Sequence, residues 1–245
     1  MKTSKTIDFI VRWIKNYKEV NEVNGFVVGV SGGIDSALTS TLCAMTGFST
    51  LCLNMPIRQK EEQYIRANKH IDWLKNKFKN VNSIDIDLTK VFNEFKSTVE
   101  NNSSENNLAL ANSRSRIRMT TLYYYAGINN SIVVGTGNKV EDFGVGFYTK
   151  YGDGGVDISP IADCNKTEVW ELGRELKILD DIINAAPTDG LWDDGRTDEG
   201  QLGLSYKEIE EAMDNENSKN RDKYIQIRKA NLHKMEPIPI CKIPN

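Results

Sequence analysis

Short runs of β-forming residues alternate with helical stretches along the first 135 residues, and this alternation constrains the fold more than any other feature. The β-rich runs lie at 26–30, 49–54, 82–88 and 131–135. Helical patterns lie between and after them, at 36–46, 60–79, 89–128, 166–178, 205–213 and 217–233. Strands joined through helices of this length run parallel in one sheet. The sequence therefore predicts an α/β fold, a doubly wound, mostly parallel sheet with helices on both faces.

Some stretches depart from this regular pattern. The 89–128 pattern is interrupted by the polar run NNSSENN and therefore predicts two helices. Residues 138–160 are rich in glycine and charge, so we expect a long irregular segment of functional interest. With 245 residues and no internal repeat, the chain is expected to form a single domain over 1–245.

Composition excludes several classes of protein. No stretch approaches 18 consecutive apolar residues, and the N-terminal helical pattern is broken by charges, so neither a membrane span nor a signal peptide is expected. We expect a cytoplasmic protein. A net charge of −3 argues against a nucleic-acid partner. The four cysteines are scattered without a C-x-x-C pair, so neither a zinc site nor a disulfide framework is indicated.

The glycine-rich stretch GVSGGIDSALTS, Gly29 to Ser40, follows the first predicted strand. Its first five residues match G-x-S-x-G, the nucleophile elbow of hydrolases. It lacks the Gly-Lys ending of a Walker A loop, and Ser31 replaces the second glycine of G-x-G-x-x-G. A hydrolase also needs a later acid and a later histidine. His70 follows Ser31 too closely, whereas His233 satisfies the order.

A phosphate loop is the second interpretation of this stretch. A glycine-rich turn between a strand and a helix directs backbone N–H groups and the positive end of the helix dipole at one point, which favours an anion. Asp35 would repel a phosphate unless a cation lay between them, so it indicates Mg²⁺. The hydrolase interpretation leaves Asp35 without a role. The simplest alternative is that Ser31 or Asp35 only caps the helix that begins near Ile34.

The run Ser31-Gly32-Gly33-Ile34-Asp35-Ser36 resembles the S-G-G-x-D-S fingerprint of the PP-loop, or N-type ATP pyrophosphatase, superfamily, whose members cleave ATP between its α and β phosphates. Three later segments resemble the NAD synthetase family: GTGNKVEDFGVGFYTKYGDGGVDISPIADCNKTEVWELGREL, APTDGLWDDGRTDEGQLGLSYKEIE and HKMEPIP. The resemblance runs from about Gly25 to Pro239. Between Glu141 and Lys150 this chain is one residue longer than some members, which leaves Asp142 as an alternative to Glu141.

The resemblance implies a Rossmann-like adenine nucleotide alpha hydrolase fold and a ligase that amidates deamido-NAD with ammonia, through an adenylate, releasing AMP and pyrophosphate. It assigns Mg²⁺ to Asp35 and Glu141, and the positioning or deprotonation of ammonia to Asp153. The ATP-binding residues it implies are Gly29, Val30, Ser31, Gly32, Gly33, Ile34, Asp35, Ser36, Thr136, Lys166 and Thr188. The implied contacts to deamido-NAD are Arg116, Lys150, Asp157, His233 and Lys234.

Taken singly, these residues have plainer interpretations. Glu141 fits the start of a surface helix, Asp153 fits a D-G turn, and His233 fits a helix end. Without the resemblance, Arg116 is not distinguished from Arg114 or Arg118.

Three further expectations concern the chain as a whole. The glycine- and aspartate-rich segment 187–205 is expected to act as a mobile lid, with 189–204 as its moving part. The synthetase pattern fills the chain and leaves no room for a glutaminase domain, so free ammonia is the expected nitrogen donor. The apolar and aromatic helix at 108–128 is expected to form a homodimer interface, as in the family, although burial within one chain would explain it equally.

Three other classes of protein compete with this interpretation. A tRNA-modifying relative would need a basic groove and, for thiolation, a catalytic cysteine. A nucleotide-binding module without catalysis would not need Asp35, Glu141, Lys150 and Asp153 together. The hydrolase is the third alternative.

Overall fold

A computed structural model describes residues 3–100, 106–192 and 194–244 of the chain. Four parallel strands form one sheet in the order β3-β2-β1-β4. They are β1 (Gly25–Gly29), β2 (Ser49–Asn54), β3 (Val81–Asp85) and β4 (Ile132–Val133). The strand order reverses beside β1, because the chain builds outward to β2 and β3 and then returns to place β4 on the other side. This reversal is the hallmark of the doubly wound fold that the sequence predicts.

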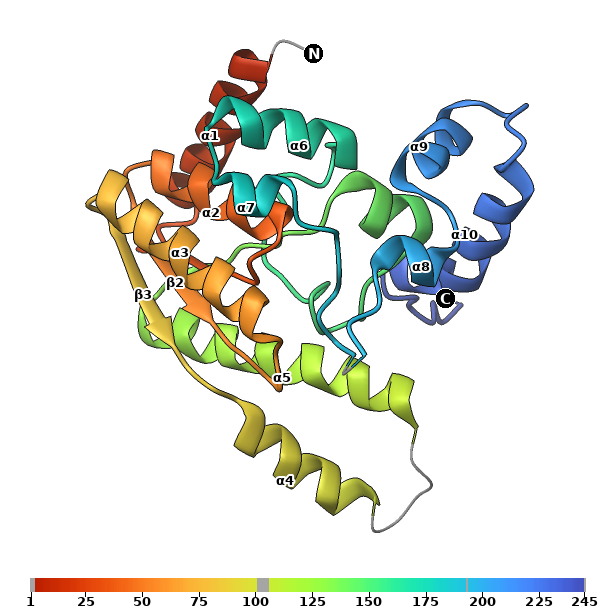
Figure 1. Ribbon diagram of the computed structural model, residues 1–245, viewed down its shortest axis with the longest axis horizontal. Coiled ribbons are helices and arrows are strands. Elements are labelled where there is room, and N and C mark those ends of the chain that lie inside the picture. Colours follow the sequence, from red (N-terminus) through yellow and green to blue (C-terminus); the bar gives the residue numbers. More distant parts are fainter. Residues whose placement is uncertain (1–2, 101–105, 193, 245) are drawn as a thin grey trace.

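Helices cover both faces of the sheet (Figure 1). Successive strand residues point to opposite faces, so Phe26 and Val28 pack against one helical layer and Val27 against the other. The first layer contains α1 (Thr3–Val20), α2 (Ile34–Met45), α6 (Lys166–Glu175) and α7 (Asp180–Ile183). The second contains α4 (Thr89–Glu100) and α5 (Asn107–Ile128). Helix α3 (Glu61–Lys77) covers β2 and β3 beside α2.

A smaller cluster lies beyond the β4 side of the sheet. It contains α8 (Asp198–Leu202), α9 (Tyr206–Asp214) and α10 (Arg221–Met235), which lie together at the right of Figure 1. These helices pack around the π-helix η1 (Lys139–Val145) through a core that includes Val140, Val145, Tyr206 and Ile209. This cluster places η1 and the three C-terminal helices beside the edge of the sheet where β1 and β4 end.

Two predictions about the regular elements need correction. The strand at 131–135 is only two residues long. Val134 N still donates to Val27 O, but Val134 also bridges Ile158, and Gly135 N donates to Ile158 O rather than to β1. The 138–160 segment is not wholly irregular, since η1 occupies its first part. A π-helix follows neither the 3.6-residue nor the two-residue period, so its sequence pattern did not indicate a helix.

The remaining predicted elements match the structure to within a few residues, and the 89–128 pattern does form two helices. Most of the predicted break between them, 101–105, lies outside the described residues, as does Asp193 in the predicted lid. Within the described ranges, no helix combines the length and the apolar character needed to span a bilayer.

Candidate active site

A pocket of about 260 Å³ opens where β1, β2 and β4 end. Its wall includes the glycine-rich turn after β1, residues Val134 to Gly137 after β4, and Asn54 to Pro56 after β2. In an open α/β sheet, ligands bind at the carboxyl ends of the strands beside the point where strand order reverses. The pocket lies at that point.

The turn after β1 has the conformation of an anion-binding loop. Gly32 adopts a φ of +83°, and a Cβ there would come within 2.7 Å of Gln63 O, so both conformation and space require glycine. Gly33 is the N-cap of α2 and no side chain caps the helix, which rules out the simple capping role for Ser31 and Asp35. The first amides of α2 therefore have no side-chain capping partner.

Ser31 is not arranged as a nucleophile. Its hydroxyl lies 3.1 Å from Ser36 Oγ and accepts from Gly33 N at 3.3 Å. His70 lies instead beside Ser40, with Nε2 3.0 Å from Ser40 Oγ. Among the hydrogen bonds of the described residues, none joins Ser31 to a histidine. The hydrolase interpretation loses its catalytic base.

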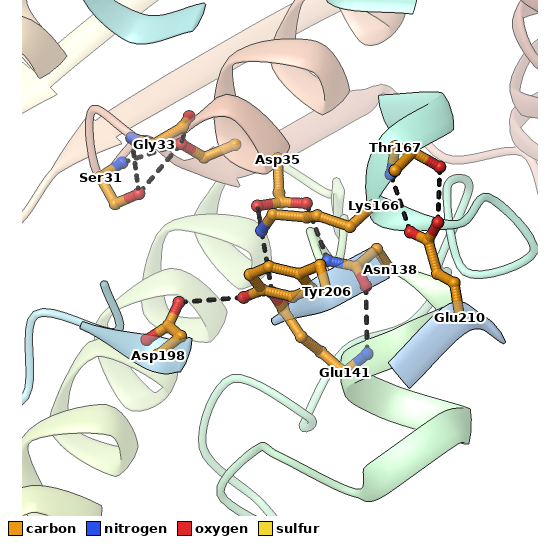
Figure 2. Close-up of polar contacts among 11 residues, drawn as sticks. Ser31, Gly33, Asp35, Asn138, Glu141, Lys166, Thr167, Asp198, Tyr206 and Glu210 are labelled. Atoms are coloured by element: carbon orange, nitrogen blue, oxygen red, sulfur yellow. Dashed lines mark hydrogen bonds and ion pairs between the residues drawn. The ribbon is translucent and has the colours of Figure 1, made fainter. Parts of the chain in front are cut away.

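A buried lysine joins the two predicted metal ligands (Figure 2). Lys166 Nζ donates to Asp35 Oδ2 at 2.6 Å and to Glu141 Oε1 at 2.8 Å. These three residues come from the N-terminus of α2, from η1 and from the N-terminus of α6. Lys166 is only 2% exposed, and its ammonium group balances one of the two carboxylates.

Burial and charge set the protonation of this group. Burial works to raise the pKa of both carboxyl groups, and the Lys166 ammonium opposes it. The pKa of Glu141 falls below its ordinary value, because the charge and the hydrogen bond of Lys166, together with the hydrogen bond from Tyr206, outweigh burial. The pKa of Asp35 rises, because burial and the Glu141 charge outweigh Lys166. Burial alone would lower the pKa of Lys166, but the two carboxylates raise it, so the lysine stays charged.

Four residues that the sequence analysis did not select support this group. Asn138 is fully buried; its side chain donates to Asp35 Oδ1 at 2.9 Å and accepts from Glu141 N at 3.1 Å. Tyr206 donates to Glu141, and Asp198 contacts Tyr206. Glu210 accepts from Thr167 N and Thr167 Oγ1 beside Lys166. All four lie within the motifs quoted above, but no residue type or spacing marked them as parts of the site.

Asp35 and Glu141 supply some of the oxygen ligands that a hard divalent cation requires. Two carboxylates held a few ångströms apart by an ammonium group are the oxygen ligands that Mg²⁺ takes in nucleotide sites, where phosphate oxygens and water complete its shell. No cluster of three or more His, Cys, Asp or Glu side chains with metal-binding geometry occurs within the described ranges. A metal here would therefore complete its coordination with water or with the oxygens of a nucleotide.

The other predicted ATP contacts mostly converge on the pocket. Thr136 and Thr188 line it, together with every residue of the Gly29–Ser36 turn except Gly32. Thr188 and Asp189 come from the predicted lid and contribute to one wall. Gly190 packs against Gln59, since a Cβ there would come within 2.5 Å of Gln59 Nε2. The mobility of this segment stays a prediction.

Asp153 also lines the pocket. Its Oδ1 accepts from Ser115 Oγ at 2.6 Å and from Thr149 N at 3.0 Å, which fixes the side chain. The surrounding protein removes water from the carboxyl group and raises its pKa. The turn thus presents an oriented acid to the cavity.

The predicted dinucleotide contacts do not line this pocket. Arg116 donates to Lys150 O, and Lys150 Nζ donates to His233 O at 3.2 Å. Lys234 donates to Tyr148 O at 2.7 Å, so four of the five residues meet where the 148–150 turn contacts α10. Asp157 lies apart from them, where it accepts from Tyr123 and from Val133 N.

A different arginine of the RSRIR run lines the pocket. Arg118 donates to Met55 O at 3.0 Å and to Gln59 Oε1 at 2.9 Å. Helical periodicity separates Arg116 and Arg118 by about 200°, which places them on different faces of α5. The sequence indicates that the two arginines lie on different faces of α5, but it does not indicate which face lines the pocket.

Comparisons with known proteins agree with this geometry. A solved structure described as NMN synthetase from Francisella tularensis has a TM-score of 0.89 and 31% identity, covering 100% of this chain and 99% of that one. A structure described as NH3-dependent NAD synthetase from Campylobacter jejuni has a TM-score of 0.79 and 25% identity, covering 99% and 100%.

Sequence relatives agree as well. An NH(3)-dependent NAD(+) synthetase from Methanosarcina acetivorans is 41% identical over 217 residues, covering 87% of this chain and 82% of the relative. One from Mesoplasma florum is 37% identical over 238 residues, covering 96% and 93%. The sequence model of the family described as NAD synthase matches residues 6–242. This chain therefore belongs to the NAD synthase family.

Proposed function

We propose that this protein is an ammonia-dependent NAD synthetase, a ligase that converts deamido-NAD to NAD at the expense of ATP. The observation that carries the proposal is the Asp35–Lys166–Glu141 group, which lies beside an anion-binding turn at the reversal point of the sheet. Charge neutralisation beside a phosphate site is what attack on the α-phosphate of ATP requires.

Two displacements make up the reaction. A carboxylate oxygen of deamido-NAD attacks the α-phosphorus, and the bond to pyrophosphate breaks with its electron pair leaving on pyrophosphate. Ammonia then attacks the acyl carbon, and AMP leaves with the bonding pair. The Gly29–Ser36 turn, Thr136 and Thr188 hold the phosphates, and Lys166 stabilises the charge that gathers on them. Since ATP is an intracellular co-substrate, we place the reaction in the cytoplasm.

Asp35 and Glu141 would hold Mg²⁺, with Asp142 lining the pocket as the neighbouring alternative. When bound, the ion would supply positive charge that offsets the negative charge of the phosphates. The protein's own contribution is to hold those carboxylates at a fixed separation. Lys166 does so in the structure described above.

Asp153 is proposed to position ammonium and to accept its proton. Ammonia is mostly protonated at neutral pH and attacks only as NH₃, so a carboxyl group with a raised pKa suits the task. The hydrogen bonds from Ser115 and Thr149 would keep the other edge of the carboxyl group directed at the pocket.

We further propose that the enzyme is a homodimer and that deamido-NAD extends beyond the pocket. The predicted dinucleotide contacts Arg116, Lys150, Asp157, His233 and Lys234 would then form its second subsite, and a partner subunit would close it. Exposed apolar residues on α5 support the dimer: Leu108, Tyr123, Tyr124 and Ile128.

A second candidate acceptor is the mononucleotide acid that corresponds to NMN. The high similarity to the Francisella structure, over nearly all of both chains, favours it. Both acceptors present the same pyridine carboxylate, so the pocket chemistry is common to both. They differ in that only deamido-NAD carries an adenylate group, which would occupy the second subsite.

One assay tests both candidates. The protein is incubated with ATP, Mg²⁺ and ammonium, with either deamido-NAD or nicotinate mononucleotide, and AMP, pyrophosphate and the two amides are measured. We expect NAD to form with a higher kcat/KM than NMN. A preference for the mononucleotide would replace the first candidate by the second, and formation of neither amide by folded protein would refute both.

A further inference from the structure

Tyr206 connects the candidate metal ligand Glu141 to the lid. It is only 1% exposed, and its hydroxyl lies 2.6 Å from Glu141 Oε1 and 3.2 Å from Asp198 Oδ2 (Figure 2). Tyr206 begins α9, whereas Asp198 begins α8 inside the 189–204 segment. The three residues thus join η1, the lid helix and α9 through one hydroxyl group.

A hydroxyl group has a single proton, and this limits how the contacts are made. The shorter contact is to Glu141, so Tyr206 donates there and its oxygen is left to accept. The same hydroxyl lies 3.2 Å from Asp198 Oδ2. An ionised Asp198 would share the Tyr206 proton with Glu141, whereas a neutral Asp198 would donate its own proton to the Tyr206 oxygen.

The surroundings of Asp198 agree with a neutral carboxyl group. Asp198 is 5% exposed, and its Oδ1 is buried without a hydrogen-bond partner in the described part of the chain. An unpaired oxygen costs less free energy on a neutral acid than on a carboxylate. Burial and the nearby Glu141 carboxylate raise the pKa of Asp198 to about 7.

Helix α9 also supports the lysine of the same group. Glu210 lies one turn after Tyr206 and accepts from Thr167 N at 2.9 Å and Thr167 Oγ1 at 2.7 Å. Thr167 follows Lys166 at the start of α6. One face of α9 therefore contacts both the carboxylate and the helix that carries the lysine.

We propose that Tyr206 and Asp198 are positioning residues that couple lid closure to the metal-binding arrangement of Glu141. This inference rests on the proposed role of Glu141 as a ligand. With the lid helix docked, Asp198 holds the Tyr206 hydroxyl, which orients Glu141 Oε1. When α8 moves away, Tyr206 loses that restraint and so does Glu141.

The first test replaces Tyr206 with Phe and uses Tyr224→Phe as the matched control. Tyr224 is buried in the same apolar cluster, and no hydrogen bond of its hydroxyl occurs among those of the described residues. We expect Tyr206→Phe to weaken Mg²⁺-dependent ATP binding by about tenfold in calorimetry, since it removes a hydrogen bond to a charged group. Binding of ATP without metal should change much less.

Trypsin reports the lid directly, because Arg196 is an exposed cleavage site within it. MgATP should slow cleavage after Arg196 in the unaltered protein and in Tyr224→Phe, but not in Tyr206→Phe. Equal MgATP affinity and equal protection in all three proteins would overturn the coupling.

Asp198 provides a second test that does not depend on the stability of Tyr206→Phe. Asp198→Asn keeps an N–H that can donate to Tyr206 Oη, whereas Asp198→Ala removes the contact. We expect the Asn variant to keep MgATP affinity and trypsin protection and the Ala variant to lose both. If the Ala variant kept both, Asp198 would not restrain Tyr206 and the inference would be wrong. Neither MgATP binding nor trypsin protection requires amide synthesis. The two readouts can therefore refute the coupling without refuting the proposed function.

Discussion

Lys166 is the residue on which the two buried carboxylates depend. Lys166→Met keeps most of the side-chain volume and removes the charge between Asp35 and Glu141. We expect the free energy of unfolding to fall by about 3–5 kcal/mol, the usual cost of leaving one side of a buried ion pair uncompensated. Urea unfolding followed by circular dichroism measures this loss.

Magnesium should restore part of that loss. A divalent cation bound between Asp35 and Glu141 replaces the missing ammonium charge, so Mg²⁺ should stabilise Lys166→Met more than the unaltered protein. Equal stabilisation of both proteins by Mg²⁺ would contradict the assignment of these two carboxylates as metal ligands.

His70 makes stability depend on pH. It is fully buried between α3 and α2, with Nε2 beside Ser40 Oγ, and burial lowers its pKa from its usual 6.5 to about 4. The unfolded chain therefore takes up the proton first as pH falls. The contribution of neutral His70 is fully present above pH 6.5 and declines as pH falls toward 4.

A pKa of about 4 in place of 6.5 makes this effect about 3 kcal/mol. Replacing His70 with Gln removes the titrating group, so the difference in unfolding free energy between the two proteins should change between pH 7 and pH 4. Chemical denaturation at a series of pH values measures it. A difference that stays constant with pH would mean that His70 does not titrate with a lowered pKa.

At the scale of the element, the conformation of the β1–α2 turn depends more on Gly32 than on Gly33. Gly32→Ala would have to keep a φ of +83° with its Cβ 2.7 Å from a backbone oxygen, whereas Gly33 has a φ of −93°. We expect Gly32→Ala to lower the free energy of unfolding by about 1–2 kcal/mol from backbone conformation alone. Gly33→Ala, whose Cβ has only Ser31 Oγ at 3.4 Å, serves as the control for stability. Similar unfolding curves for the two variants would contradict this account of the turn.

At the scale of the whole molecule, the proposed homodimer is tested by placing a charge on α5. Tyr124 is 63% exposed, and a carboxylate there would be desolvated by a partner subunit. We expect Tyr124→Glu to shift the protein to monomers in sedimentation analysis and to raise the KM for deamido-NAD. Phe9 on α1 is also 63% exposed, so Phe9→Glu is the matched control. A monomeric unaltered protein, or dissociation by both substitutions, would contradict an α5 interface.

The sequence by itself determined the sheet and the phosphate turn. Strand and helix periods, and the glycines after β1, are local signals, and the parallel doubly wound sheet follows from them. Motif order also selected Asp35, Glu141 and Lys166, which the structure brings together. Asp35 and Lys166 lie at helix starts, where local pattern and chain direction already limit their position. Glu141 lies in η1, and only the motif selected it.

The tertiary structure decided how that group is supported and which residues reach the pocket. The contact of Tyr206 with Glu141 spans 65 positions and depends on how α9 packs against η1, and η1 itself has no periodic signal. The choice of Arg118 over Arg116 as a pocket residue likewise depends on the rotation of α5 against the sheet. Side-chain contacts across such separations follow from packing of whole helices, and no local sequence pattern encodes that packing.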